Sequence, residues 1–179
     1  VNSNLPESRR IAEHYAAARH VPAANIIALP MSAEETISWP EFLATVWQPL
    51  QAELVRQKWI DGMPMALTDK VGRREYVIGG HRISYLVTCR GVPLRIAHSA
   101  ELFVPRPAPY NAGELRTNQG AVDSELSLLA QPDYPINSFI PNPLFRVDRP
   151  SFWEREKVVK VTRLDGPTVD DALGLVDRA

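Results

Sequence analysis

The sequence predicts an α/β fold, namely a three-layer, Rossmann-like parallel sheet with helices on both faces. Short apolar runs of the buried-strand type alternate with segments whose apolar residues recur at helical spacing. The chain of 179 residues has the length of one ordinary domain. Hydrophobic residues make up 45% and charged residues 23%, which is typical of a folded globular domain.

The first third of the chain predicts two helices with a strand between them. A helix over 6–20 begins at Pro6-Glu7, because proline and an acidic residue suit a first turn. The apolar run 25–29 predicts a short buried strand. The capping-box pattern over 38–41 then predicts a helix over 39–55. Pro49 should kink that helix near its middle, since it removes one hydrogen bond.

The middle of the chain contains the strongest strand signal. Segment 61–82 is rich in Gly, Pro and charges, and Gly79-Gly80 is a candidate hairpin turn. The run 83–89 is apolar, β-branched and aromatic, which predicts a central strand. A short helix is expected over 121–130.

The C-terminal part predicts one more strand and one more helix. The strand covers 158–162, and the helix covers 168–176 with Ala172, Leu175 and Val176 on its inner face. We expect one α/β domain over 1–179, with a Pro-rich irregular insertion at about 97–150. We also expect a fragment truncated at both ends, because the chain opens on Val-Asn-Ser and stops inside a helical pattern.

Candidate site residues follow from a rule of open α/β sheets, in which ligands bind beyond the carboxyl ends of the strands. The rule singles out Asn2 and Ser3 at the start of the chain, and Cys89, Arg90, Gly91, Arg163, Asp165 and Gly166 at the ends of the predicted strands. Because 83–89 and 158–162 are both apolar runs, we expect their carboxyl ends to lie side by side, with Arg90 or Gly91 near Arg163 and Asp165.

Arg163 and Asp165 allow two interpretations. The guanidinium and the carboxylate are groups that orient a polar or anionic ligand. Alternatively, they pair with each other or with neighbouring backbone and brace the turn.

Asp123 and Glu125, at the start of the predicted helix 121–130, also allow two interpretations. Paired carboxylates serve acid–base or metal chemistry, but residues two apart point to different faces of a helix. The preference of acidic residues for a helix's first turn explains them equally well.

Composition excludes several classes of partner and cofactor. The net charge of −1 gives no field to attract nucleic acid, and no apolar run is long enough to span a membrane. The single cysteine excludes an intramolecular disulfide and a multi-thiolate metal site, and the four histidines show no metal-motif spacing. GxGxxG, GxxxxGK and GxSxG motifs are absent, so we expect no cofactor and no metal.

Cys89 is expected to be a small core residue rather than a nucleophile. A nucleophilic thiolate needs a nearby base or a positive field. No histidine follows a strand in a comparable position, and Arg90 need not approach the sulfur because adjacent strand residues point to opposite faces.

Several blocks carry a resemblance to known proteins, and they lie at 2–12, 85–96, 122–126 and 161–168. Together they resemble an uncharacterised bacterial family that occurs in species with exosortase and PEP-CTERM sorting systems, which implies a bacterial, envelope-associated protein. More distantly, the block Thr162–Gly166 is similar to one in the non-catalytic half of gingipain-type peptidases of the caspase-like clan.

Three functions are therefore expected as alternatives. The first is a non-catalytic or half-catalytic Rossmann-like domain, which makes contact with the remainder of a longer polypeptide. The second is the N-terminal half of a caspase-clan hydrolase whose catalytic dyad lies downstream. The third is a binding module that uses the crevice at the strand ends. The sequence leaves the substrate, the partners and the choice between cytoplasm and export open.

Overall fold

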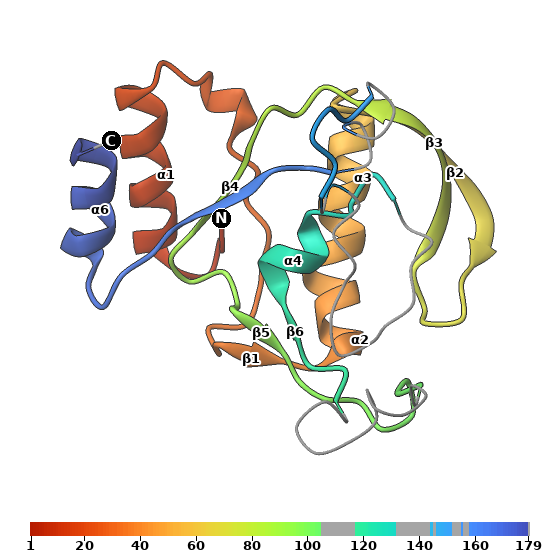
Figure 1. Cartoon of the computed structure of the whole chain (residues 1–179). Coiled ribbons are helices and arrows are strands. Elements are labelled where there is room, and N and C mark those ends of the chain that lie inside the picture. The colour runs from red at the N-terminus through yellow and green to blue at the C-terminus, as the bar shows by residue number, and fades with distance from the viewer. Residues whose placement is uncertain (105–116, 132–143, 145, 152–154, 156–157, 179) are drawn as a thin grey trace.

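The computed structural model describes residues 1–104, 117–131, 144, 146–151, 155 and 158–178 (Figure 1). The regular elements in chain order are α1 (Pro6–Ala18), a 3₁₀ turn (Ala23–Asn25), β1 (Thr36–Ile37), α2 (Trp39–Phe42), a π-helical turn (Leu43–Trp47), α3 (Gln48–Arg56), β2 (Ile60–Thr68), β3 (Arg74–His81), β4 (Leu86–Cys89), β5 (Arg95–Ile96), β6 (Gly120–Ala121), α4 (Val122–Leu126), β7 (Val161–Leu164) and α6 (Val169–Arg178). The fold is mixed α/β. Among the described residues, every helix is too short or too polar to cross a bilayer.

The strands form small, mixed sheets. β1, β5 and β6 form one sheet, in which β1 and β5 are parallel and β6 is antiparallel to β5. β2 and β3 form an antiparallel pair, and β4 and β7 form a parallel pair. The single three-layer parallel sheet expected from the sequence is therefore not confirmed.

The prediction of a strand over 25–29 was wrong in the length of that strand. Residues Ala23–Asn25 form a 3₁₀ turn after Pro22, and the Ile26 N–H donates to the Ala23 carbonyl at 3.0 Å. The turn leaves only Leu29 to pair, in a parallel bridge with Asn2. Proline fixes φ where the chain leaves α1, so the turn begins before the apolar run starts.

The helix predicted over 39–55 is present, and its N-terminus is capped as expected. The Ser38 hydroxyl accepts a hydrogen bond from the Glu41 N–H at 3.3 Å. The break expected at Pro49 takes the form of the π-helical turn Leu43–Trp47 just before it. Proline lacks an N–H and therefore leaves a carbonyl of the preceding turn without a donor. A π-helical turn gives such carbonyls other donors. The apolar side chains of Phe42, Val46, Leu50 and Leu54, which recur at helical spacing, are buried.

The hairpin turn lies away from the predicted Gly79-Gly80. Both glycines are inside β3, and the register slips opposite them between Asp61 and Gly62. The turn is closed by Asp69, whose carboxylate accepts from the N–H groups of Val71 and Arg73 at 3.0 and 2.8 Å. An Asx turn of this kind replaces the glycine turn that the sequence suggested.

The remaining predicted elements exist with shifted ends. β4 begins at Leu86 instead of 83, β7 covers 161–164 instead of 158–162, and α4 ends at Leu126. On α6, Ala172 and Val176 are buried as predicted, but Leu175 is 39% exposed. Part of the expected insertion is described, as β6 and α4, while 105–116 and 132–143 lie outside the described residues.

Two apolar clusters pack around the β4–β7 pair. The smaller one joins α1, β4 and α6 through Ile11, Ala12, Cys89 and Ala172. The larger one contains α2, the π turn and α3, and residues of β4 and β7 pack against it. Figure 1 shows α1 and α6 together on one side of β4 and β7, with α3 on the other side. The carboxyl ends of these two strands are thereby held between helices.

Candidate functional site

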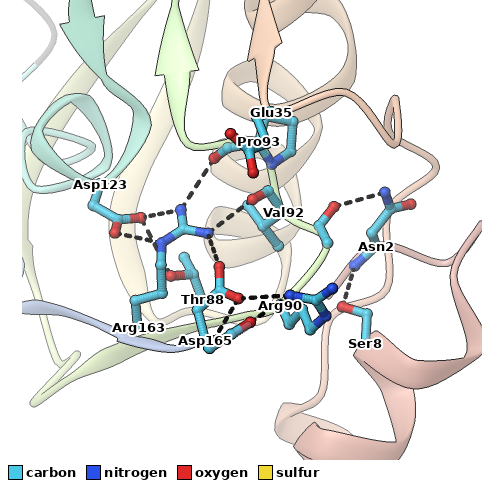
Figure 2. Close-up of polar contacts among 12 residues, drawn as sticks. Asn2, Ser8, Glu35, Thr88, Arg90, Val92, Pro93, Asp123, Arg163 and Asp165 are labelled. Carbon is cyan, nitrogen blue, oxygen red and sulfur yellow. Dashed lines mark hydrogen bonds and ion pairs between the residues drawn. The ribbon is translucent and has the colours of Figure 1, made fainter. Parts of the chain in front are cut away.

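The carboxyl ends of β4 and β7 lie side by side, as the sequence predicted. Leu86 pairs with Val161, and Cys89 pairs with Leu164, in parallel register. The Arg90 N–H continues the ladder by donating to the Leu164 carbonyl at 2.8 Å. The residues after both strands therefore meet at one edge, which Figure 2 shows in close-up.

Arg163 is the most engaged side chain at this edge. Its Nε and Nη2 donate to the two carboxylate oxygens of Asp123 at 2.7 and 2.6 Å. Nη1 donates to the Val92 carbonyl at 2.8 Å, and Nη2 also donates to the Pro93 carbonyl at 3.0 Å. The side chain is only 14% exposed. Of the two interpretations of Arg163, this geometry favours the brace, which ties β7 to α4 and to the turn after β4.

Thr88 completes the contact with Asp123 from the strand next to β7. Its hydroxyl oxygen lies 3.2 Å from Oδ1 of Asp123 and 3.3 Å from the Thr162 carbonyl oxygen. Thr88 is buried, and sequence reasoning did not select it. The available signal was a hydroxyl within an otherwise apolar strand, since a buried hydroxyl needs a hydrogen-bond partner.

Arg90 and Asp165 form the second polar group of the site. Arg90 Nη1 donates to the Gly166 carbonyl and lies 3.5 Å from Oδ1 of Asp165. The same carboxylate oxygen accepts from the Gly166 N–H at 2.8 Å, and Oδ2 lies 3.7 Å from Nη1 of Arg163. Asp165 thus bridges the two arginines, and the Arg90 side chain stays 35% exposed.

Gly91 occupies a position that only glycine adopts without strain. Its φ is +89°, and a Cβ built there would lie 2.7 Å from Cδ1 of Leu5. The Gly91 carbonyl accepts from the Asn2 side-chain amide at 2.8 Å. Gly91 therefore lets the chain turn closely past the residues that precede α1.

The structure gives Asn2 and Ser3 different places. Asn2 is buried, and its amide also donates to the Ser32 carbonyl at 2.9 Å, while its N–H donates to the Ser8 hydroxyl at 3.0 Å. Ser3 is exposed, and its N–H donates to the Leu29 carbonyl at 2.8 Å. Asn2 organises the loop beneath the site, whereas Ser3 is held there through its backbone N–H.

A crevice of about 750 Å³ opens at this edge. Arg90, Gly91, Arg163 and Asp165, all predicted from the sequence, belong to its wall. The acidic residues Glu7, Glu34 and Glu35, which the sequence reasoning missed, also belong to it. Four carboxylates and two guanidinium groups therefore line the crevice, which gives it an excess of negative charge.

Ion pairs outside the crevice modify this balance. Arg163 is neutralised by Asp123, which is not a wall residue. Glu35 pairs with Arg95 at 3.1 Å, on an exposed surface where such pairs are weak. Glu7, Glu34 and Asp165 therefore share the crevice wall with Arg90, whose guanidinium is partly accessible.

Cys89 lies in the smaller apolar cluster and is 2% exposed. Burial raises the pKa of the thiol, while the Val1 ammonium and Arg163 oppose that rise. A thiol with a raised pKa carries little thiolate near neutral pH. The geometry therefore favours a core role for Cys89.

The described residues contain no group of three or more His, Cys, Asp or Glu side chains arranged to hold a metal ion. His14, one of the four histidines, lies 2.6 Å from the Asp177 carboxylate and joins α1 to α6. Asp123 contacts Arg163, while Glu125 is buried. The structure therefore engages Asp123 as the ion-pair partner of Arg163.

No family model, no curated protein and no solved structure matches the chain.

Proposed function

We propose that this chain is a non-catalytic α/β domain that binds a small, positively charged polar molecule in the crevice at the ends of β4 and β7. The observation that carries the proposal is the crevice itself. It lies at the carboxyl ends of a parallel strand pair, where ligands bind in α/β proteins. Its walls come from four separate parts of the chain, so the fold has to be formed before the crevice exists.

The charges of the wall support a ligand that carries a protonated amine. Glu7 and Glu34 in the crevice wall attract a cation, whereas Asp165 already pairs with the two arginines and Arg163 is committed to Asp123. Arg90 remains partly exposed and offers N–H groups to a hydroxyl or carbonyl on the same ligand. A dianion would face more carboxylates than available guanidinium groups.

The experiment is an NMR titration of the ¹⁵N-labelled chain with 1,4-diaminobutane, and with succinate as the anionic comparison. We expect saturable shifts of the amides of Ala33–Glu35, Gly91 and Gly166 with the diamine and none with succinate. The double variant Glu7→Gln/Glu34→Gln should weaken diamine binding about tenfold, which corresponds to about 1.4 kcal/mol.

Glu13→Gln is the matched control, because Glu13 is exposed and pairs with Arg9 on α1, away from the crevice wall. It should leave diamine binding unchanged. Equal binding of succinate, or equal loss of affinity in Glu13→Gln, would contradict the proposed ligand class.

The Rossmann-like arrangement belongs to the same proposal. Three parallel pairings support it, namely β4 with β7, β1 with β5, and Asn2 with Leu29. We propose that they are parts of one three-layer plan in which helices flank parallel strands. Membership of the bacterial family found with exosortase systems likewise stays a prediction from the sequence blocks.

The hydrolase alternative has less support from the geometry. Its strongest argument was the block Thr162–Gly166, and the structure gives Arg163 in that block the role of a brace. The thiol of Cys89 is buried, and its pKa is raised. The binding module is therefore the function that the geometry supports best.

A further inference from the structure

A second cavity, of about 370 Å³, runs along the edge of β4 that faces away from β7. We call it the edge slot. Ile26, Ile27 and Leu29 line one wall, and Ile83, Leu86 and Val87 line the other. It does not belong to the crevice, whose wall shares only Val92 with it.

The backbone of β4 presents hydrogen-bonding groups to the edge slot. The Leu86 and Arg90 N–H groups donate to Lys160 and Leu164, on the β7 side. Alternate residues of a parallel strand bond to opposite neighbours. The N–H groups of Val87 and Cys89 therefore point to the edge that the slot borders.

The first residues of the chain already form the end of a strand in this position. The Val1 amino group donates to the Ile27 carbonyl at 2.8 Å, and the Leu29 N–H donates to the Val1 carbonyl at 3.0 Å. On the opposite side, the Asn2 side chain reaches the Gly91 carbonyl after β4. Val1 and Asn2 thus lie between the segment 27–29 and the end of β4.

The two faces of the edge slot determine which side chains fit it. Ala12, Tyr15 and Ala16 of α1 border one face. Leu50 and Leu54 of α3 border the other. A strand covered by helices on both faces reads as a nearly continuous apolar run, without polar alternation.

The surroundings of the Val1 nitrogen support a peptide bond at this position. It is buried beside the slot, and burial lowers the pKa of its amino group because the charged form loses hydration. A peptide nitrogen in the same place keeps the hydrogen bond to Ile27 and carries no charge.

We propose that the edge slot is the site of one additional β-strand, parallel to β4, apolar on both faces and joined to the nitrogen of Val1. This inference does not depend on the ligand proposed for the crevice. The added strand would join the segment 27–29, β4 and β7 into one parallel sheet.

The test extends Val1 of the full chain by the five residues Ile-Val-Val-Ile-Val, and separately by Ser-Thr-Asn-Thr-Ser. We expect the apolar extension to raise the Tm by at least about 5 °C, since several apolar side chains become buried. Hydrogen exchange of the Val87 and Cys89 amides should slow more than tenfold. The polar extension should produce neither effect.

Two further measurements separate the effect of a joined strand from the effect of a lost charge and from that of a free peptide. Acetylation of Val1 removes the charge without adding a strand, and it should leave the exchange of the Val87 and Cys89 amides unchanged. The free peptide Ile-Val-Val-Ile-Val-amide should protect these amides far less than the joined extension at the same concentration.

Equal Tm values for the apolar and polar extensions would overturn the proposal. Equal protection by the free peptide would also overturn it, because the slot would then accept a strand from a separate chain. Protection of amides on β2 and β3 in place of β4 would contradict the assigned location.

Discussion

The crevice and the edge slot border the same strand, β4. They differ in whether the polar groups of their walls have partners within the protein. At the carboxyl end of β4, Arg163 donates two hydrogen bonds to Asp123 and forms an ion pair with Asp165, so the crevice keeps its shape without a ligand. Along the side of β4, the slot is apolar and the amides of Val87 and Cys89 face it. A wall whose polar groups are paired within the protein preserves a binding site. An apolar wall beside an unpaired strand edge is a place where another strand can bind.

Loss of the Asp123 carboxylate should have the largest effect on the crevice. Asp123→Ala removes both carboxylate oxygens that accept hydrogen bonds from the Arg163 guanidinium, which is only 14% exposed, and leaves the Asp165 carboxylate at 3.7 Å. Removing one partner of a buried ion pair costs about 3 kcal/mol, and the partial exposure of Asp123 keeps the expected loss in unfolding free energy near that value. Urea denaturation measures it.

Asp170→Ala is the control for this substitution. Asp170 is exposed in the first turn of α6, and its replacement should change the unfolding free energy by less than about 0.5 kcal/mol. If both variants lose the same stability, Arg163 is not held by Asp123 in solution.

Substitution of Gly91 should have a smaller effect at the same edge. Gly91→Ala places a Cβ at φ +89° and 2.7 Å from Leu5 Cδ1, and the strain should cost about 1–2 kcal/mol of unfolding free energy. Leu5 can move, so the backbone accounts for most of this cost.

Gly174→Ala, inside α6, provides the matched comparison. Its added Cβ would approach Arg178 no closer than 3.7 Å, so the higher helix propensity of alanine should raise stability by about 0.5–1 kcal/mol. Thermal melts of the two variants should move in opposite directions. A parallel decrease in both would show that glycine is needed for a reason other than φ.

The pH dependence of stability should be the smallest effect, and it concerns the edge slot. Burial lowers the pKa of the Val1 amino group below its usual 8.0, so the folded chain binds fewer protons and stability increases as pH rises toward 8. Burial raises the pKa of the Cys89 thiol above 9.0. The stability that comes from keeping this thiol protonated is therefore fully present below pH 9.0 and is lost as the pH rises further.

Denaturation between pH 6 and pH 10 tests both slopes. Acetylation of Val1 should remove the increase up to pH 8, and Cys89→Ala should remove the part of the alkaline loss that comes from the thiol. Unchanged slopes in both modified chains would mean that these two groups are hydrated in the folded protein.

The site was easier to predict from the sequence than the sheet. Two apolar runs were enough to place Arg90 beside Asp165, because the carboxyl ends of parallel strands share an edge. The partner of Arg163 was not predictable in the same way. Asp123 lies 40 residues away in the sequence, and its first-turn position suggested a local role.

The errors in the fold have local physical causes. Pro22 starts a turn that uses part of the apolar run 25–29, and Asp69 closes a hairpin turn that glycine was expected to make. In both cases a side chain or ring changes the hydrogen bonding of a few residues, which apolar periodicity does not report.

The pairing of β4 with β7 also has a consequence for folding kinetics. Thr88 contacts Thr162 across 74 residues of sequence, so the chain has to close a long loop before the two strands can meet. Loop closure costs entropy before the distant contacts stabilise the fold, so we expect this pairing to form late, after the transition state. Substitutions at Arg163 or Asp123 should therefore accelerate unfolding and leave the refolding rate almost unchanged. The residues that shape the crevice would then determine how long the folded state persists more than how quickly it is reached.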